Sequence, residues 1–299
     1  MTAIYKRELK AYFSSPLGYI VVAFFMFSVG LIFCIYNLVN QYPWFGVGLY
    51  SGIKLYSIRI NMSFILFLII PIITMRIMSE DRKQKIDQLL YTAPVKIIEI
   101  VLGKYLSVIS IYAIPMLIFC LYPILLLSFG KNPNSLSMDY VVILGYFLLG
   151  AAWLAIGFFA STITESQVLA AVLTFAILLM SNFSSGLASL IPATSAASLI
   201  ALSILIIILG FIVYFMTKSI FMALLSSLVV EAIILVLFLI DASVFSGLIN
   251  KILYILDMSA QMDNLVYGAL DLTVIAYYLS VIVLFIFLSV QAIYKRRWS

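Results

Sequence analysis

Side chains able to do chemistry are few in this chain of 299 residues. It has no His, which excludes His-ligated metals, His general bases and Ser-His-Asp triads. The glycine-rich P-loop that holds nucleotide phosphates is also missing. The only adjacent acids are Glu80 and Asp81. We therefore expect no catalytic residue, no metal ligand and no cofactor in the chain, and charged side chains that act through contacts.

Glu231 is the acid most deeply embedded in an apolar run, near the middle of 219–240. A charged side chain at the centre of a membrane costs about 2.5–3.5 kcal/mol on insertion scales, so Glu231 should face protein or water. Two readings stay open. Glu231 is either an acid on a substrate or proton path, or a protonated or hydrogen-bonded structural residue between helices.

Three aspartates, Asp257, Asp263 and Asp271, lie in the segment 242–273. Their spacing matches no calcium-binding loop, so we expect a solvated face. The apolar residues of this segment recur at helical spacing, at Ile249, Ile252, Leu253 and Leu256. This pattern predicts a helix at the outer membrane interface.

The elements that position these residues follow from composition: 65% of residues are apolar, 10% are charged and the mean hydropathy is +1.22. Soluble domains are about 45–50% apolar and about 25% charged, so a soluble enzyme, a disordered chain and a nucleic-acid binder are excluded. A membrane-spanning helix needs about 20 apolar residues. We expect a single all-α, polytopic membrane domain over 1–299 with about eight spans: 17–38, 59–77, 101–128, 140–162, 166–188, 197–217, 219–240 and 274–294.

The basic residues predict the orientation, because Lys and Arg are enriched in cytoplasmic loops. Cytoplasmic termini place all 17 basic residues inside except Lys54, Arg59, Lys131 and Lys251. An odd number of spans would break this agreement.

The N-terminal stretch 1–15 is amphipathic and precedes the first apolar run. Its charged side is formed by Lys6, Arg7, Glu8 and Lys10. We expect a helix on the inner membrane surface, where anionic lipids add about 1 kcal/mol per nearby cation.

The residue pattern of the segment 79–94 predicts a cytoplasmic helix. Glu80 and Asp81 would lie at the positive end of its dipole, and Pro94 would end it. Its apolar residues Ile86, Leu89 and Leu90 share one face. A helix this short is marginal alone, so this face needs a cover, either the membrane surface or a partner protein. Glu165, in the turn 163–166, is either an exposed capping acid or a second contact to the same partner.

Three stretches together resemble the permease subunit of type-2 ABC exporters, the ABC-2 family, and most closely its gliding-motility-associated branch. Residues 6–20 look like that branch's connecting helix and the start of its first span. Residues 71–76, 80–82 and 89–95 look like its second span and coupling helix. Residues 266–298 look like its last span and tail. The family pattern has Gly-Thr where this chain has Lys85 and Ile86.

This resemblance implies that two permease chains form the pathway and that two separate ATPase subunits bind ATP and magnesium beneath them. The residues implied in the ATPase-coupling interface are Glu80, Asp81, Arg82, Ile86, Leu89, Leu90, Pro94 and Glu165. It also implies a bacterial plasma membrane. Family members usually have six spans, so the hairpin 197–240 is an addition, one that a membrane-tethered accessory subunit could contact.

Three other functions compete with this permease. A stand-alone, ion-coupled secondary transporter would depend on Glu231. A membrane-embedded enzyme would need clustered acids, His or a metal, so it ranks last. A membrane subunit that transmits motion without transport would share the ATPase partner and differ only in showing no flux. The substrate class stays open between peptide, lipid, glycan and drug-like molecules.

Overall fold

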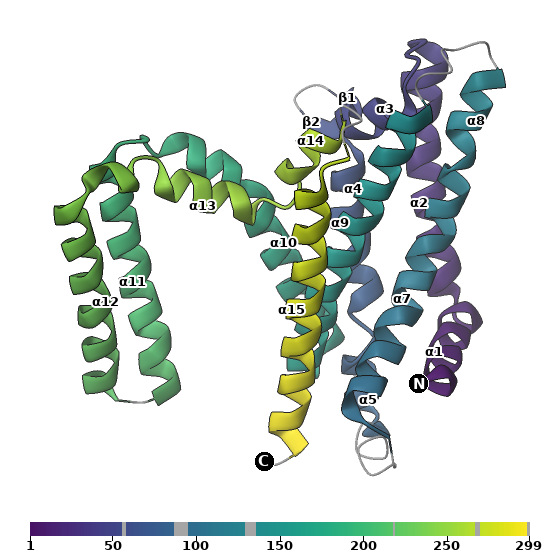
Figure 1. Ribbon diagram of the computed structural model, residues 1–299. Helices are drawn as coiled ribbons and strands as arrows, with labels where there is room; N and C mark the ends of the chain where they lie inside the picture. The colour runs from purple at the N-terminus through teal and green to yellow at the C-terminus, as the bar shows by residue number, and fades with distance from the viewer. Residues whose placement is uncertain (56–57, 87–94, 129–135, 218, 267–269, 298–299) are drawn as a thin grey trace. The chain divides into compact units, whose positions relative to one another are not determined.

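The computed structural model describes residues 1–299 except 56–57, 87–94, 129–135, 218, 267–269 and 298–299 (Figure 1). The chain divides into two compact units. Met1–Leu179 with Gln261–Ser299 form one unit, which we call the main bundle. Met180–Ala260 form the other, which we call the hairpin unit.

The main bundle is built from helices and one small antiparallel hairpin of strands. In chain order its elements are α1 (Thr2–Ser14), α2 (Pro16–Ile32), the π-helix η1 (Phe33–Val39), α3 (Phe45–Ser51), β1 (Ile53–Leu55), β2 (Ile58–Ile60), α4 (Met62–Thr74), α5 (Ser79–Lys83), α7 (Ile97–Phe119), α8 (Leu121–Ser128), α9 (Leu136–Ile163), the first half of α10 (Gln167–Leu190), α14 (Asp263–Val266) and α15 (Leu272–Arg297). The short 3-10 turn η4 (Ala260–Met262) precedes α14.

Helix α9 forms the core of the main bundle and packs against α15, α4 and α7. Its large side chains Tyr146, Trp153 and Phe158 are completely buried. Gly157 faces the Thr74 side chain of α4 so closely that a Cβ atom would collide with it. The missing side chain therefore lets α9 and α4 approach.

One end of the main bundle carries the strands. Ile53 of β1 pairs with Ile60 of β2, and Asn61 then caps α4 by accepting a 2.9 Å hydrogen bond from the Phe64 N–H. The predicted span 59–77 therefore begins three residues late, at Met62. The buried Asp139 of α9 accepts a 2.7 Å hydrogen bond from the Gly46 N–H of α3.

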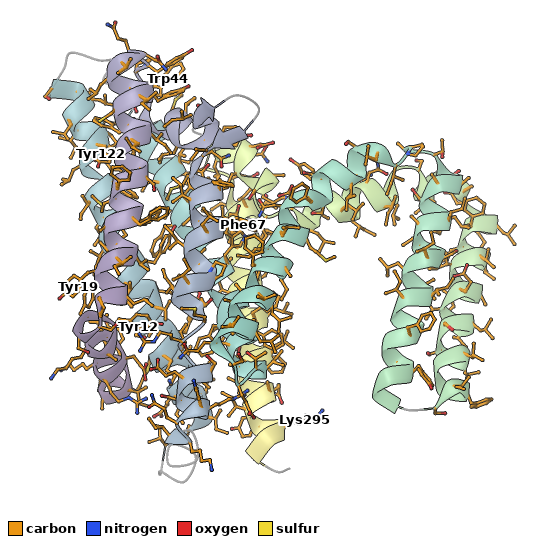
Figure 2. All side chains as sticks on the ribbon, turned by 180° about the vertical axis from the view of Figure 1, so that it is seen from behind. Tyr12, Tyr19, Trp44, Phe67, Tyr122 and Lys295 are labelled. Carbon is orange, nitrogen blue, oxygen red and sulfur yellow. The ribbon has the colours of Figure 1, made fainter. Side chains whose placement is uncertain are left out.

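The opposite end, which we call the basal end, carries α1, α5, the turn between α9 and α10 and the end of α15. Figure 1 shows both chain termini there. In Figure 2, Tyr12 and Lys295 lie at this end and Trp44 lies at the other. Both termini therefore share one end of the bundle, as an even number of spans requires.

The hairpin unit contains the second half of α10, α11 (Ser195–Thr217), α12 (Ile220–Ile240), the 3-10 turn η3 (Ala242–Phe245) and α13 (Leu248–Leu256). Helices α11 and α12 pack along each other (Figure 1). The Asn250 side chain of α13 donates hydrogen bonds of 2.8 and 2.9 Å to the carbonyl oxygens of Ala188 and Ile191. Helix α13 lies inside the segment 242–273, where the sequence predicts an outer helix.

The all-α, polytopic membrane fold is confirmed. Six described helices are long and apolar enough to cross a membrane: Pro16–Val39, Met62–Lys83, Ile97–Ser128, Leu136–Ile163, Gln167–Leu190 and Leu272–Lys295. A seventh is possible if Leu224–Ile240 and Ala242–Leu256, bent by 115°, count as one span. The predicted spans 197–217 and 219–240 coincide with α11 and α12, helices of 23 and 21 residues.

Candidate functional site: a charged cluster at the basal end

Lys104 is the centre of the basal end. Its side chain is 1% exposed, although it is the only basic residue of α7 and lies within an apolar helix. The Lys104 Nζ lies 2.5 Å from Asp81 Oδ2 of α5 and 3.2 Å from Glu8 Oε1 of α1. It also donates a 2.7 Å hydrogen bond to the Ile77 carbonyl oxygen. One ammonium group therefore joins α1, α5 and α7.

Arg7 completes this cluster from the solvent side. Its guanidinium lies 2.6 Å from Glu8 Oε1 and 3.3 Å from Asp81 Oδ2. Two cations and two carboxylates make the group formally neutral. This balance matters because a buried charge is costly unless it is paired and hydrogen-bonded.

A second ion pair lies next to the contact between α1 and the end of α4. The Arg76 guanidinium donates to both oxygens of Glu80, at 2.6 and 2.9 Å, and reaches the Ser15 hydroxyl at 3.4 Å. Beside it, the buried Tyr12 hydroxyl donates a 2.7 Å hydrogen bond to the Ile73 carbonyl. Burial raises the pKa of the Tyr12 phenol, which keeps it protonated as a donor.

Helix α5 is also fixed to α9 and to the turn that follows it. The Ser161 hydroxyl accepts hydrogen bonds from the N–H groups of Met78 and Ser79, at 3.1 and 3.2 Å. The buried Arg82 guanidinium donates a 3.2 Å hydrogen bond to the Thr164 carbonyl. The backbone donors at the start of α5, which a helix leaves unpaired, are therefore satisfied by a spanning helix.

Glu165 and Lys83 meet at one exposed surface. They line an open hollow of about 360 Å³ with Ser166, Gln167 and Val168. In the sequence, the segment 79–94 and Glu165 are two predicted partner contacts that lie far apart. The structure brings the first part of that segment and Glu165 together, so a single partner surface can touch both.

The predicted helix over 79–94 is not continuous, because a turn at 84–85 interrupts it. Helix α5 ends at Lys83, because Lys85 adopts a left-handed conformation with φ of 56°. Ile86 is half-buried just after this break. The predicted contacts Leu89, Leu90 and Pro94 lie outside the described residues.

The prediction for the N-terminal helix needs a similar correction. Lys6, Arg7 and Lys10 are exposed, but Glu8 is buried and paired with Lys104. Ion pairs therefore bind helix α1 to α7 and α5. The prediction gave α1 only a contact with the membrane surface. The signal that could have found this contact is Lys104 itself, since a lone cation inside an apolar run requires a partner.

The remaining acids lie apart from the basal cluster. In the hairpin unit, Glu231 accepts a 2.6 Å hydrogen bond from the Ser203 hydroxyl. Asp257 is 3% exposed, not solvated as predicted, because Ser185 and the N–H groups of Ser259 and Ala260 donate to it.

In the main bundle, Asp263 and Asp271 have partners of their own. Asp263 accepts a 2.6 Å hydrogen bond from Tyr50, and Asp271 accepts a 2.8 Å hydrogen bond from the Thr273 N–H. Within the described part of the chain, no three Cys, Asp or Glu side chains gather as metal ligands would.

Comparison with known proteins gives one result. Residues 47–230, more than half of the chain, match the model of the ABC-2 family transporter proteins. Neither the curated proteins nor the solved structures compared with the chain give a match. The matched segment contains α5, Lys104 and Glu165, three parts of the basal end. With its spanning helices, the chain therefore belongs to the ABC-2 family of transporter proteins and is a multi-pass membrane permease component.

Proposed function

We propose that this chain is the membrane subunit of an ATP-driven exporter. Two permease chains form the translocation pathway, and two separate ATPase subunits bind at the basal end, which faces the cytoplasm. Chemistry takes place in the ATPase, which holds ATP and magnesium. This chain contributes no catalytic residue.

The observation that carries the proposal is the way α5 is held. Asp81 is paired with Lys104 of α7, Arg82 is bonded to the turn after α9, and two backbone N–H groups next to α5 are bonded to Ser161. A displacement of α5 must therefore move α7 and α9 or break several buried polar contacts. Such contacts cost more to break in a low-dielectric interior than at the surface.

Coupling to ATP follows from this linkage. A ligand shifts a conformational equilibrium only through contacts that differ between the two states. ATP binding changes the ATPase dimer, and the ATPase touches the permease at α5 and at the hollow beside Glu165. The α5 linkage then makes the arrangement of α7 and α9 depend on the state of the ATPase.

The contact surface has a defined charge pattern. Lys83 and Glu165 place one positive and one negative group on the hollow. The complementary ATPase surface carries an acid opposite Lys83 and a base opposite Glu165, because complementary charges fix register and speed association. Ile86, Leu89, Leu90 and Pro94 extend this surface as sequence predictions.

The finer assignment is the gliding-motility-associated branch, in a bacterial plasma membrane. It rests on the resemblance of residues 6–20, 71–76, 80–82, 89–95 and 266–298 to that branch. A membrane-tethered accessory subunit is a further partner in this assignment, with the hairpin unit as its contact.

A detergent pull-down of the tagged chain from its native membrane, followed by mass spectrometry, tests the proposal. We expect a stoichiometric soluble protein that contains a P-loop. The double substitution Lys83→Glu and Glu165→Lys reverses the two charges of the hollow. It should reduce recovery of the ATPase at least tenfold, which corresponds to about 1.4 kcal/mol of binding free energy. The matched control is Lys251→Glu, an exposed lysine of α13, which should leave recovery unchanged.

The other outcomes separate the competing functions. A chain that elutes without an ATPase in mild detergent contradicts the proposal, and loss of ion-driven flux in Glu231→Gln would then favour a secondary transporter. A complex that hydrolyses ATP without substrate flux in vesicles would favour the motion-transmitting subunit.

A further inference from the structure

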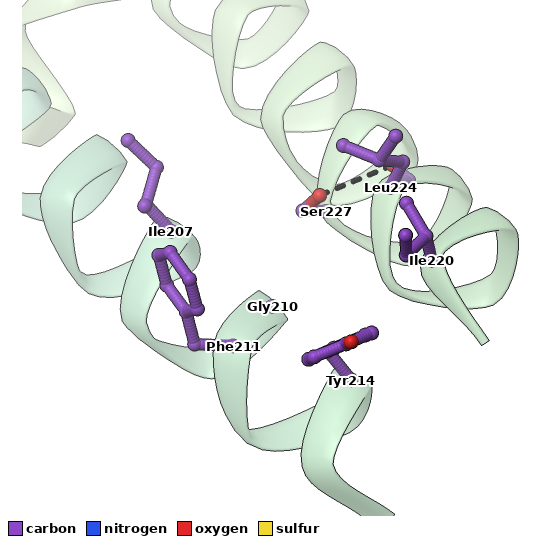
Figure 3. A pocket seen from close by; sticks show the side chains of 7 residues that line it. All are labelled: Ile207, Gly210, Phe211, Tyr214, Ile220, Leu224 and Ser227. Atoms are coloured by element: carbon purple, nitrogen blue, oxygen red, sulfur yellow. Dashed lines mark hydrogen bonds between the residues drawn. The ribbon is translucent and has the colours of Figure 1, made fainter. Parts of the chain in front are cut away.

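A cleft lies between the two helices of the hairpin unit, outside the basal site. Its volume is about 310 Å³. Figure 3 shows the residues that line it: Ile207, Gly210, Phe211 and Tyr214 from α11, and Ile220, Leu224 and Ser227 from α12. Most of this lining is hydrocarbon or aromatic.

The cleft exists because side chains leave the space between the helices open. Gly210 has no side chain to fill it. The Ser227 hydroxyl donates a 3.1 Å hydrogen bond to the Leu224 carbonyl of its own helix (Figure 3). Phe211 is 63% exposed and Leu224 is 56% exposed, so the hairpin unit does not cover its own lining.

An acidic residue lies one helical turn beyond the lining at one end of the cleft. Ser203 lies one helical turn beyond Ile207, and Glu231 lies one turn beyond Ser227, so both follow the lining faces. The Ser203 hydroxyl donates to Glu231 Oε1 at 2.6 Å and joins the two helices at this point. Among the described residues, no ion pair includes Glu231.

The dimensions restrict the occupant. The lining of α11 together with Ser203 covers eleven residue steps, or about 16 Å along the helix. The volume is at the small end of the range of about 300–1,000 Å³ for ligand sites. These dimensions fit one alkyl chain or a slender ring system and exclude a two-chain lipid.

We propose that the α11–α12 cleft binds a single-chain hydrophobic amine, with the apolar part in the cleft and the ammonium group on Glu231. The apolar walls hold the alkyl chain through van der Waals contacts, which are individually weak and large in sum. The Glu231 carboxylate supplies a counter-charge where the dielectric constant is low and charge pairing is strong. The same carboxylate disfavours an acidic ligand of the same length. This site is independent of the ATPase interface.

Binding to the purified full-length chain in nanodiscs tests this site without any ATPase, so its failure does not bear on the exporter proposal. The probes are dodecylamine and dodecan-1-ol, which share an alkyl chain and differ in charge. Native mass spectrometry counts bound probe as concentration rises. We expect the amine to bind with a saturable stoichiometry of one per chain.

Two substitutions assign the two parts of the site. Gly210→Leu fills the cleft and should weaken the binding of both probes at least tenfold. Glu231→Gln keeps the shape and removes the charge, so it should weaken dodecylamine about tenfold and leave dodecan-1-ol unchanged. Glu99→Gln, an acid in the first turn of α7, is the matched control and should change neither.

Three results would overturn the assignment. If Gly210→Leu leaves probe binding unchanged, the probe binds outside the cleft. Equal affinity for amine and alcohol would remove the role of the carboxylate. Equal weakening of both probes in Glu231→Gln would show that Glu231 only maintains the hairpin, as its hydrogen bond to Ser203 alone would require.

Discussion

Lys104 shows how far single residues can be understood from the sequence. Helical spacing places Lys85 four residues after Asp81 and so favours that pair. The structure instead pairs Asp81 with Lys104, 23 residues away in the chain, because α5 ends before Lys85 is reached. The lysine inside an apolar run indicates a need for a partner, but the identity of the partner depends on how three helices pack.

We expect Lys104→Met to destabilise the main bundle by about 3–5 kcal/mol, because it leaves Glu8 and Asp81 without their buried counter-charge. The measurement is chemical unfolding of the purified chain in detergent micelles. Lys96→Met, at the exposed start of α7, is the matched control and should change stability by less than about 0.5 kcal/mol.

A second variant separates charge from shape at this position. The triple substitution Glu8→Gln, Asp81→Asn and Lys104→Met removes the buried charges together and should recover part of the lost stability. If Lys104→Met alone unfolds at the same denaturant concentration as the natural chain, the cluster contributes no stability and does not hold α1 and α5.

Among the elements, the apolar runs predict most helices and miss their interruptions. The runs 140–162 and 274–294 each lie within one helix, and the run 166–188 begins one residue before α10. In a membrane, a long apolar segment must satisfy its backbone hydrogen bonds internally, which favours a helix. The early end of α5 was not predictable from hydrophobicity. It depends on one backbone conformation, at a position where the family pattern has glycine.

At position 85, glycine should be more stable than any residue with a Cβ atom. A left-handed backbone costs a residue with a Cβ atom about 1–2 kcal/mol, and glycine avoids this cost. We expect Lys85→Gly to raise the thermal unfolding temperature of the purified chain and Lys85→Val to lower it. Lys83→Gly, inside α5, is the control and should lower it, since glycine is unfavourable within a helix. A lower unfolding temperature for Lys85→Gly would contradict the left-handed turn.

For the whole molecule, the sequence predicts the membrane class and the family but not the division into two units. The membrane class follows from amino-acid composition, which does not depend on which residues are in contact. The basal cluster joins Glu8, Asp81 and Lys104, which are far apart in the chain, so no local pattern displays it. The hairpin is visible as two apolar runs, yet the cleft between them depends on how α11 and α12 pack, with Gly210 in its lining.

Deletion of 195–240 should leave the rest of the chain inserted and folded. It removes two antiparallel helices, so the direction of every remaining span is kept, and the Asn250 contacts to Ala188 and Ile191 do not involve the deleted residues. We expect reporters fused to both termini to stay on one side of the membrane, and ATPase recovery to be unchanged. Dodecylamine binding should be lost.

A deletion of 220–240 alone is the contrasting control. It removes one helix of the pair and should misplace the C-terminal reporter or lead to degradation. If the larger deletion gives the same result as the smaller one, the hairpin is required for insertion of the rest of the chain.

The burial of Lys104 also bears on how the protein is synthesised. A ribosome delivers the chain from its N-terminus, so Glu8 and Asp81 emerge before the lysine that they neutralise. When α7 enters the insertion machinery, its counter-charges are already tethered at the membrane surface. Had the order been reversed, a bare ammonium group would have waited in the lipid for carboxylates not yet translated. The order of residues along the chain thus provides each charge in time for its burial.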